Sequence, residues 1–350
     1  MAFQRTKEFF EDRWEDMQDY MGGGLLPKVI GGGLLAYLLV AVVLGFFWSS
    51  APAEFEVEAA AANKAMLNGH EVVVGTTTTT TLIMLTETLL EKPGGYIHND
   101  ILPPGLWLDN ISSWEFGVLV QVRDLARALR KDLSRVQSQS TEDPDLAIAE
   151  PQFNFDSNSW AVPSTEREYR RGIKALDRYL GRLSDPNKKE AQFYSRADNL
   201  SNWLSDVENR LGSLSQRLSE SVGRQQLDLG LAGDPSAVQS TEALSMTEKR
   251  TPWLEIDNVF YEARGTAWAL IHILKAIEID FDKVLRDKNA LVSLKQIIIE
   301  LESTQESVWS PMILNGSGFG MLANHSLTMT SYISRANAAI IDLRSLLQQG

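Results

Sequence analysis

The sequence predicts an all-α protein in which a single N-terminal transmembrane helix precedes an elongated helical-bundle body with long heptad-patterned helices. Two observations predict this fold class. Residues 29–48 read VIGGGLLAYLLVAVVLGFFW and carry no charge, and a helix of that length, at about 1.5 Å per residue, crosses the roughly 30 Å hydrocarbon core of a bilayer. Beyond residue 117, apolar side chains recur at alternating spacings of three and four residues, which is typical of helices that bury one face.

The apolar segment is interpreted as a permanent anchor. A signal peptide has an apolar region of only about 7–15 residues and ends at a small-residue cleavage site. Here the segment is longer and ends in Phe46, Phe47 and Trp48, and aromatic residues are typical of the membrane–water interface. Cleavage within residues 49–51 (SSA) is the alternative.

Lysine and arginine counts predict the orientation of the anchor. Four basic residues precede the segment, whereas Lys64 is the only one among the first twenty residues after it. Because basic residues stay on the cytoplasmic side, the chain is predicted to cross the membrane once with its N-terminus in the cytoplasm. The predicted domains are a cytoplasmic amphipathic tail (1–24), the transmembrane anchor (25–48), a stalk (49–65) and a periplasmic helical body (66–350), with a possible sub-boundary in the linker 225–250.

Small residues recur at four-residue spacing inside the anchor, at Gly32 and Ala36 and again at Ala41 and Gly45. Such spacing lets two membrane helices approach closely. It indicates a self-association face, and the alternative is that glycine is simply common in membrane helices.

The composition limits the possible partners and chemistry. The chain has 350 residues, of which 44% are hydrophobic and 23% charged, as in globular proteins with a substantial core. Its formal net charge is −13, and residues 1–48 hold only −2 of it. Because nucleic acid requires a positive protein face, this acidic body predicts no nucleic-acid partner. The sequence contains no cysteine, which excludes disulfides and thiol catalysis.

The start of the body is predicted from β-branched residues and helix breakers. Residues 71–75 (EVVVG) are the best strand candidate, and the six threonines at 76–81 either extend that strand or cap a helix that begins near Leu82. That helix is expected to end at 92–95 (KPGG). Residues 96–115 are expected to form an aromatic loop that packs on the body.

Apolar seams predict the remaining helices. Several such seams in one chain can bury one another, which favours an intramolecular bundle over an oligomeric coiled coil. Residues 137–163 are polar, with three prolines and no lysine or arginine, and are expected to form a surface loop; residues 225–247 are expected to be flexible. The seams run through residues 118–136, 169–183, 193–218, 256–284, 291–301 and 329–347.

The search for catalytic motifs predicts that the chain is not an enzyme and holds no metal or cofactor. None of the four histidines has a second histidine three or four residues away, so zinc-binding spacings are absent; His272, surrounded by apolar residues, is expected in the core. No G-x-S-x-G motif occurs. The glycine-rich segment 315–320 has neither a nearby lysine nor a preceding strand, as a phosphate loop requires.

One aromatic block is the candidate surface for a ligand or a partner. Flat aromatic rings stack on sugars and on apolar groups, and the polar side chains among them can form hydrogen bonds. The alternative is that these side chains plug one end of the bundle. The candidate residues are Tyr96, His98, Asp100, Trp107, Trp114, Phe153, Phe155 and Trp160.

The same block carries a resemblance to a known family. The chain resembles a family of proteobacterial inner-membrane proteins catalogued only as a domain of unknown function, from the anchor to the C-terminus. The resemblance implies a Gram-negative inner membrane and a periplasmic body, and it implies no known activity, ligand or catalytic residue. It rests on segments 94–110, 114–117, 121–124, 142–145, 150–155 and 169–172.

Three functions are consistent with these observations. The favoured one is a non-catalytic interaction or scaffold component of the bacterial cell envelope, whose partner is another envelope protein or a second copy of the chain. The second is a binding module for a small envelope ligand or a cell-wall fragment. The third is a hydrolase, which requires two carboxylates that converge in a cleft; its candidates are Glu115, Asp124, Glu166, Glu168 and Asp177.

Overall fold

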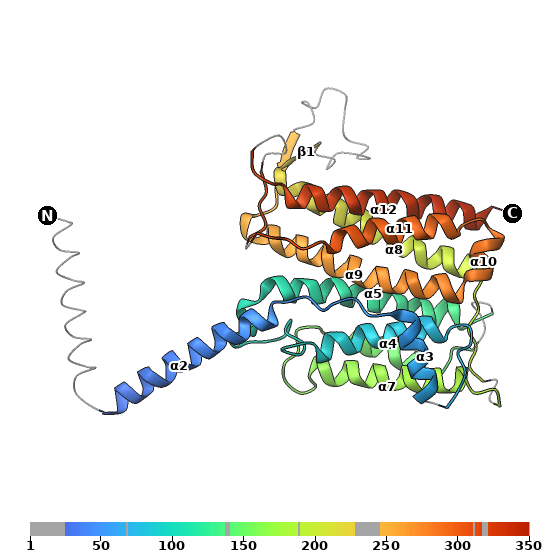
Figure 1. The fold of residues 1–350 in the computed structure, drawn as a ribbon, viewed down its shortest axis with the longest axis horizontal. Coiled ribbons are helices and arrows are strands. Elements are labelled where there is room, and N and C mark those ends of the chain that lie inside the picture. The colour runs from blue at the N-terminus through green and yellow to red at the C-terminus, as the bar shows by residue number, and fades with distance from the viewer. Residues whose placement is uncertain are drawn as a thin grey trace, which may run out of the picture.

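A long apolar helix and a helical bundle make up the computed structural model, which describes residues 25–67, 69–136, 141–187, 190–227, 246–310, 312–316 and 321–349. The helix α2 (Leu25–Trp48) extends obliquely from one end of the bundle (Figure 1). The predicted fold class is therefore confirmed. The predicted amphipathic tail (1–24), and residues 228–245 of the segment expected to be flexible, lie outside the described residues.

The body consists of helices joined by short turns. A two-stranded antiparallel sheet, β1 (Arg224–Leu227) with β2 (Met246–Lys249), lies between α8 and α9. One-turn elements precede or follow several helices: η1 (Gly105–Trp107), η2 (Leu129–Leu133), η3 (Glu220–Val222), η4 (Trp253–Glu255) and η5 (Ser303–Gln305). The helices are α3 (Val57–Leu67), α4 (Thr76–Glu91), α5 (Asp109–Ala128), α6 (Leu146–Phe153), α7 (Thr165–Leu183), α8 (Ala197–Ser219), α9 (Ile256–Asp280), α10 (Asp282–Asp287), α11 (Leu291–Glu302) and α12 (His325–Gln348).

Helices α5 and α9 form the centre of the bundle (Figure 1). Helices α4 and α7 lie on one side of this pair, and α8, α11 and α12 lie on the other. The predicted seams are buried within the molecule: Leu204 and Leu211 of α8, like Ile333 and Ile340 of α12, are fully buried. At about 1.5–3 kcal/mol for each fully buried aliphatic side chain, these seams stabilise the bundle.

Two glycines allow α5 and α9 to cross closely. A Cβ atom on Gly117 would lie 2.1 Å from the carbonyl oxygen of Glu262, and one on Gly265 would lie 2.0 Å from the carbonyl oxygen of Trp114. Real Cβ atoms do not approach backbone oxygens so closely. The absence of a side chain at both positions therefore sets the distance between the two central helices.

The prediction of a strand at residues 71–75 is wrong. Residues 71–73 have no regular structure, residues 74–75 form a turn, and α4 begins at Thr76, so all six threonines are helical and buried. Asp280, at the end of α9, explains this early start. Its carboxylate accepts hydrogen bonds from the backbone N–H groups of Gly75 (2.9 Å) and Thr78 (2.7 Å) and from the Thr78 hydroxyl (2.7 Å). The first N–H groups of a helix lack partners within it, and a distant side chain satisfies them here.

The surface loop expected at residues 137–163 contains the helix α6, so this prediction is also wrong. Phe153 and Leu146 of α6 are fully buried. Arg182 of α7 fixes the segment before α6, because its guanidinium pairs with both Asp143 and Asp145 at 2.7 Å. The apolar residues of α6 are too few for a convincing periodic pattern, and the tertiary ion pairs hold the helix in place.

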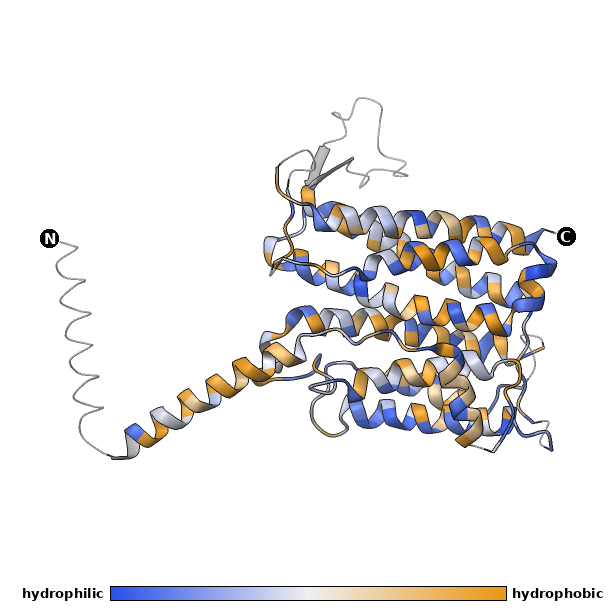
Figure 2. Cartoon of the chain, in the orientation of Figure 1, coloured by the Kyte–Doolittle hydropathy of each residue, from blue (hydrophilic) through white to orange (hydrophobic). Residues whose placement is uncertain are grey.

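The helix α2, predicted to be the anchor, joins the body at the end where α4 and α11 finish and α5, α7, α9 and α12 begin, which we call the anchor end (Figure 1). Figure 2 shows that α2 is mostly apolar beyond its first turns, and residues Lys28–Trp48 form a helix long and apolar enough to cross a membrane. The residues after it, predicted as a stalk, run along the body. Phe55 stacks on His272 with ring centroids 4.1 Å apart, and His272 is buried as expected.

Candidate functional site

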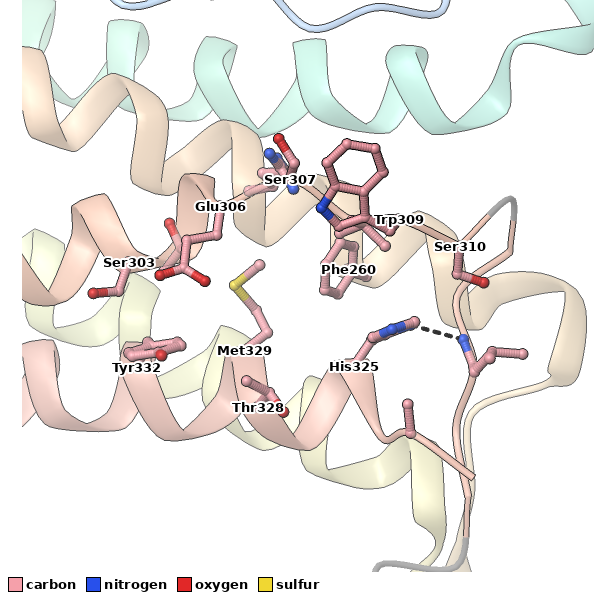
Figure 3. Close-up of a pocket in the computed structure, with 15 residues that line it drawn as sticks. Phe260, Ser303, Glu306, Ser307, Trp309, Ser310, His325, Thr328, Met329 and Tyr332 are labelled. Atoms are coloured by element: carbon pink, nitrogen blue, oxygen red, sulfur yellow. Dashed lines mark hydrogen bonds between the residues drawn. The ribbon is translucent and has the colours of Figure 1, made fainter. Parts of the chain in front are cut away.

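An apolar cavity of about 460 Å³ opens at the anchor end between α9, α12 and the segment that joins α11 to α12 (Figure 3). Phe260 of α9 and Met329 of α12 point toward it, and Trp309 lies at its rim. The other lining residues are Arg264, Ser303, Thr304, Glu306, Ser307, Val308, Ser310, Leu314, Ala323, His325, Thr328 and Tyr332.

A network of hydrogen bonds holds the joining segment against the start of α12. The Leu314 N–H donates to Nδ1 of His325 (2.9 Å), and the His325 N–H donates to the Leu314 carbonyl (3.0 Å). Because Nδ1 accepts, the proton of the neutral imidazole lies on Nε2. Asn324 caps α12 by accepting from the Leu327 N–H at 3.0 Å, and its amide donates to the Gly316 carbonyl at 2.8 Å. Hydrogen bonds between backbone groups and the side chains of Asn324 and His325 therefore hold the cavity wall in place.

Arg264 brings a positive charge to this apolar cavity. Its guanidinium donates to the Gln305 carbonyl at 2.7 Å, and the Gln305 amide donates back to the Arg264 carbonyl at 3.1 Å. Burial lowers the pKa of Arg264, yet a guanidinium stays protonated in proteins. The cavity therefore combines apolar walls with the positive charge of the Arg264 guanidinium.

The rim of the cavity exposes large apolar side chains. Trp309 is 96% exposed, and Met321 and Leu322 on the same joining segment are also exposed. Ligand cavities have volumes of about 300–1,000 Å³ and mostly apolar walls, and exposed apolar groups beside a cavity indicate an interaction site. These properties suit the site to binding a ligand or a partner.

A second cavity, of about 420 Å³, lies between α5, α8 and α9 and is polar. Its arginines are engaged with carboxylates: Arg127 with Asp206 (2.9 Å), Arg210 with Asp124 (2.9 Å) and Arg217 with Glu262 (2.6 Å). Each of these arginines is therefore paired with a carboxylate, and one of the carboxylates, Asp124, lies behind the lining of the cavity.

In the structure, some residues of the predicted aromatic surface are buried in the core and the others lie nearer the surface. Tyr96, Trp114 and Phe153 are buried. Tyr96 and Phe153 both meet Tyr169, with ring centroids 5.7 and 6.4 Å away, and Trp114 packs on Trp268 at 5.1 Å. These three residues belong to the core and offer no open face to a ligand.

The remaining candidates lie nearer the surface, on two different loops. His98 is half-buried, its Nδ1 lies 2.7 Å from the Ser112 hydroxyl, and burial lowers its pKa. Asp100 is exposed, Trp107 is 50% exposed and Trp160 is 62% exposed. Phe155 is half-buried, and its carbonyl accepts from Arg123 at 2.9 Å. A binding role for these residues stays a prediction.

The four small residues of the anchor also have different surroundings. A Cβ on Gly32 would meet nothing within 4 Å, and Ala36 is exposed. Ala41 is 2% exposed, and Gly45 lies against Pro104 and Leu108 of the body. Two of these positions therefore contact the body of the same chain, and self-association through the other two stays a prediction.

Four of the five dispersed carboxylates lie in separate ion pairs, and the Oε2 atom of the fifth, Glu166, is buried without a hydrogen-bond partner among the described residues. Glu115 is fully buried and pairs with Lys92 at 2.6 Å; Asp124 pairs with Arg127 and Arg210, Glu168 with Arg171, and Asp177 with Lys64. Burial raises the pKa of Glu115 to about 7 against the opposing effect of Lys92. Within the described part of the chain, no group of three or more His, Asp or Glu side chains could hold a metal ion. That the chain is not an enzyme and needs no cofactor stays a prediction.

Sequence reasoning missed the cavity, because its residues come from three segments that are distant in the chain. One signal was available: the glycine-rich segment 315–320 immediately precedes a helix. Its first two residues, Asn315 and Gly316, belong to the hydrogen-bonded wall of the site. Residues 317–320 lie outside the described part of the chain.

Comparison with known proteins identifies one family. Residues 23–350 match the bacterial family described as "uncharacterized protein conserved in bacteria (DUF2333)". No curated protein and no solved structure matches the chain. The match covers the helix α2 and the whole body, and its description gives no activity.

Proposed function

From the premise that the chain belongs to the bacterial family DUF2333, we propose that it is a membrane-anchored, non-catalytic interaction component of the bacterial cell envelope. Its partner is another envelope protein or a second copy of the chain. The cavity at the anchor end, with its exposed apolar rim, carries this proposal.

Contacts between α2 and the body support a retained anchor. The Tyr37 hydroxyl donates to the Pro103 carbonyl at 2.7 Å, Ala41 is buried, and the Trp48 ring lies against Gly94. Removal of a signal peptide would leave these body surfaces uncovered. Together with the basic residues before the anchor, the contacts support an inner-membrane protein with its body in the periplasm.

The cavity suits apolar side chains of a protein partner. Trp309 is almost fully exposed, and tryptophan is enriched among the residues that dominate binding energies. Phe260 and Met329 form apolar walls beneath it (Figure 3). A partner helix that places one or two apolar side chains in the cavity would bury this rim.

Site-specific photocrosslinking in the intact envelope tests the proposal. We expect a crosslinker placed at Trp309 to capture one defined protein, and the mass of the adduct distinguishes a second copy from another protein. The control crosslinker replaces Val292, which is 77% exposed at the far end of the bundle. Thr328→Arg, which adds bulk at an exposed position of the cavity lining, should abolish the adduct. An adduct that survives Thr328→Arg, or equal capture at both positions, would contradict the proposal.

A small amphipathic ligand is the second candidate, because Arg264 supplies a cation inside an apolar cavity of suitable volume. A ligand with an anionic group and an apolar tail fits this combination. Native mass spectrometry of the full chain extracted from membranes should then show a bound small molecule that is lost in Arg264→Met. The control Arg286→Met changes an exposed ion pair and should keep the ligand. Identical spectra for both variants would remove this candidate.

A further inference from the structure

The segment 101–108 is an exposed apolar loop that lies beside the anchor. It reads ILPPGLWL and carries no charge. Ile101, Leu102, Leu106 and Trp107 are 49%, 67%, 58% and 50% exposed, and the loop contacts the anchor through Pro103, Pro104 and Leu108. Contiguous apolar surface of this kind indicates contact with a protein or a membrane.

The contact with Tyr37 sets the depth of this loop in the membrane. Tyr37 lies eleven residues before Trp48, which is about 16 Å along the helix. A shift of the anchor toward the periplasm would draw the charged Lys28, at the cytoplasmic end of the apolar segment, into the hydrocarbon core. Tyr37 therefore lies near the middle of a hydrocarbon core roughly 30 Å thick, and the loop that reaches it lies at the level of the outer leaflet.

Part of the backbone of this loop has internal hydrogen-bond partners or lacks a donor, which an apolar surrounding favours. Pro103 and Pro104 have no N–H to satisfy. The carbonyls of residues 102–105 all accept hydrogen bonds, in order from the Leu106 N–H, the Tyr37 hydroxyl, the Trp107 N–H and the Leu108 N–H, at 2.7–3.1 Å.

Exposed tryptophans gather at the same end of the body. Trp160 and Trp253 are 62% and 75% exposed, and they lie on the segments that lead into α7 and α9, which both begin at the anchor end (Figure 1). Trp114, Trp203 and Trp268, within the helices α5, α8 and α9, are buried. Tryptophan favours the membrane–water interface, where its ring is buried and its N–H is hydrated.

We propose that residues 101–108 insert into the outer leaflet beside the anchor and that the tryptophan-bearing end of the body rests on the lipid surface. This inference depends on the anchored arrangement proposed above. The anchor and the loop form two attachments, which fix the orientation of the body, so that the cavity opens close to the membrane. The occupant of this surface is lipid, because the loop follows the anchor to a depth at which lipid surrounds it.

The absence of native cysteine allows a direct test with single-cysteine variants of the full chain in nanodiscs of phosphatidylethanolamine and phosphatidylglycerol. The test position is Leu106→Cys. Val43→Cys reports on the anchor and matches Leu106 in exposure, at 58% each; Val292→Cys reports on the far end of the body. We expect a water-soluble maleimide to label Val292→Cys fully and to leave the other two unlabelled. A fluorophore attached to Leu106→Cys or Val43→Cys after unfolding and reconstitution should be quenched by lipids that carry a quencher on the acyl chain.

The outcomes separate this inference from the proposed function. If Leu106→Cys is labelled as readily as Val292→Cys while Val43→Cys is protected, the anchor holds and membrane insertion of the loop is refuted. If Leu106→Cys is protected but its fluorophore escapes the lipid quencher, a protein covers the loop and the inference also fails. Full labelling of Val43→Cys would contradict the anchor itself and, with it, both proposals.

Discussion

Acidification should destabilise the folded chain, because His272 holds the segment after the anchor only as a neutral imidazole. The Phe55 N–H donates to Nε2 of His272 at 3.0 Å, and Nδ1 lies 2.7 Å from the Trp268 carbonyl, to which it donates. A protonated imidazole cannot accept the hydrogen bond from Phe55. Burial lowers the pKa of His272 from 6.5 to about 4.

The size of the effect is set by linkage between protonation and folding. Below pH 6.5 the unfolded chain protonates His272, whereas the folded chain resists protonation until about pH 4. This contribution to the free energy of unfolding is therefore fully present above pH 6.5 and is lost as the pH falls through 4. At 1.36 kcal/mol per pKa unit, the loss from this group at about pH 4.5 is about 2.5 kcal/mol.

Urea unfolding of the full chain in detergent, monitored from about pH 7 to about pH 4.5, measures this loss. The variant His272→Gln keeps an oxygen acceptor for Phe55 and removes the titration, so its free energy of unfolding should fall by about 2.5 kcal/mol less than that of the native chain. His70→Gln, at a half-buried position just after α3, is the control and should behave like the native chain. Parallel pH dependences for the native chain and His272→Gln would refute the reasoning.

Three further predictions concern the stability of the body, each measured as a change in the free energy of unfolding. Gly117→Ala should destabilise the body by about 1–3 kcal/mol, because the new Cβ would meet the Glu262 carbonyl. The control Gly181→Ala has open space around it and should stabilise α7 by up to about 1 kcal/mol. Equal effects of the two substitutions would contradict the close crossing of α5 and α9. Asp280→Ala should cost about 2 kcal/mol or more, since it leaves the buried start of α4 without acceptors, and unchanged stability would show that water replaces the carboxylate. Lys92→Met should lower the free energy of unfolding by about 3–5 kcal/mol, because it leaves the Glu115 carboxylate buried without its cation. The double variant Lys92→Met/Glu115→Leu should recover part of this stability.

The anchor and most of the helices could be predicted from the sequence because both depend on local patterns. An uncharged segment of twenty residues has a length and polarity that suit a bilayer, whichever residues come after it. A seam such as the one in α8 predicts a helix because its apolar residues return to one face every three or four positions. For the same reason the helix break after α4 was visible in Pro93 and the two glycines next to it.

The tertiary structure alone decided features that depend on residues far apart in the chain. Helix α4 begins at Thr76 rather than near Leu82 because Asp280, more than two hundred residues later, accepts its first N–H groups. Helix α6 forms in a polar segment because Arg182 fixes the residues before it. The cavity and the loop beside the anchor likewise exist only where distant segments meet: periodicity shows which face of a helix is apolar, and packing decides which of those faces stay exposed.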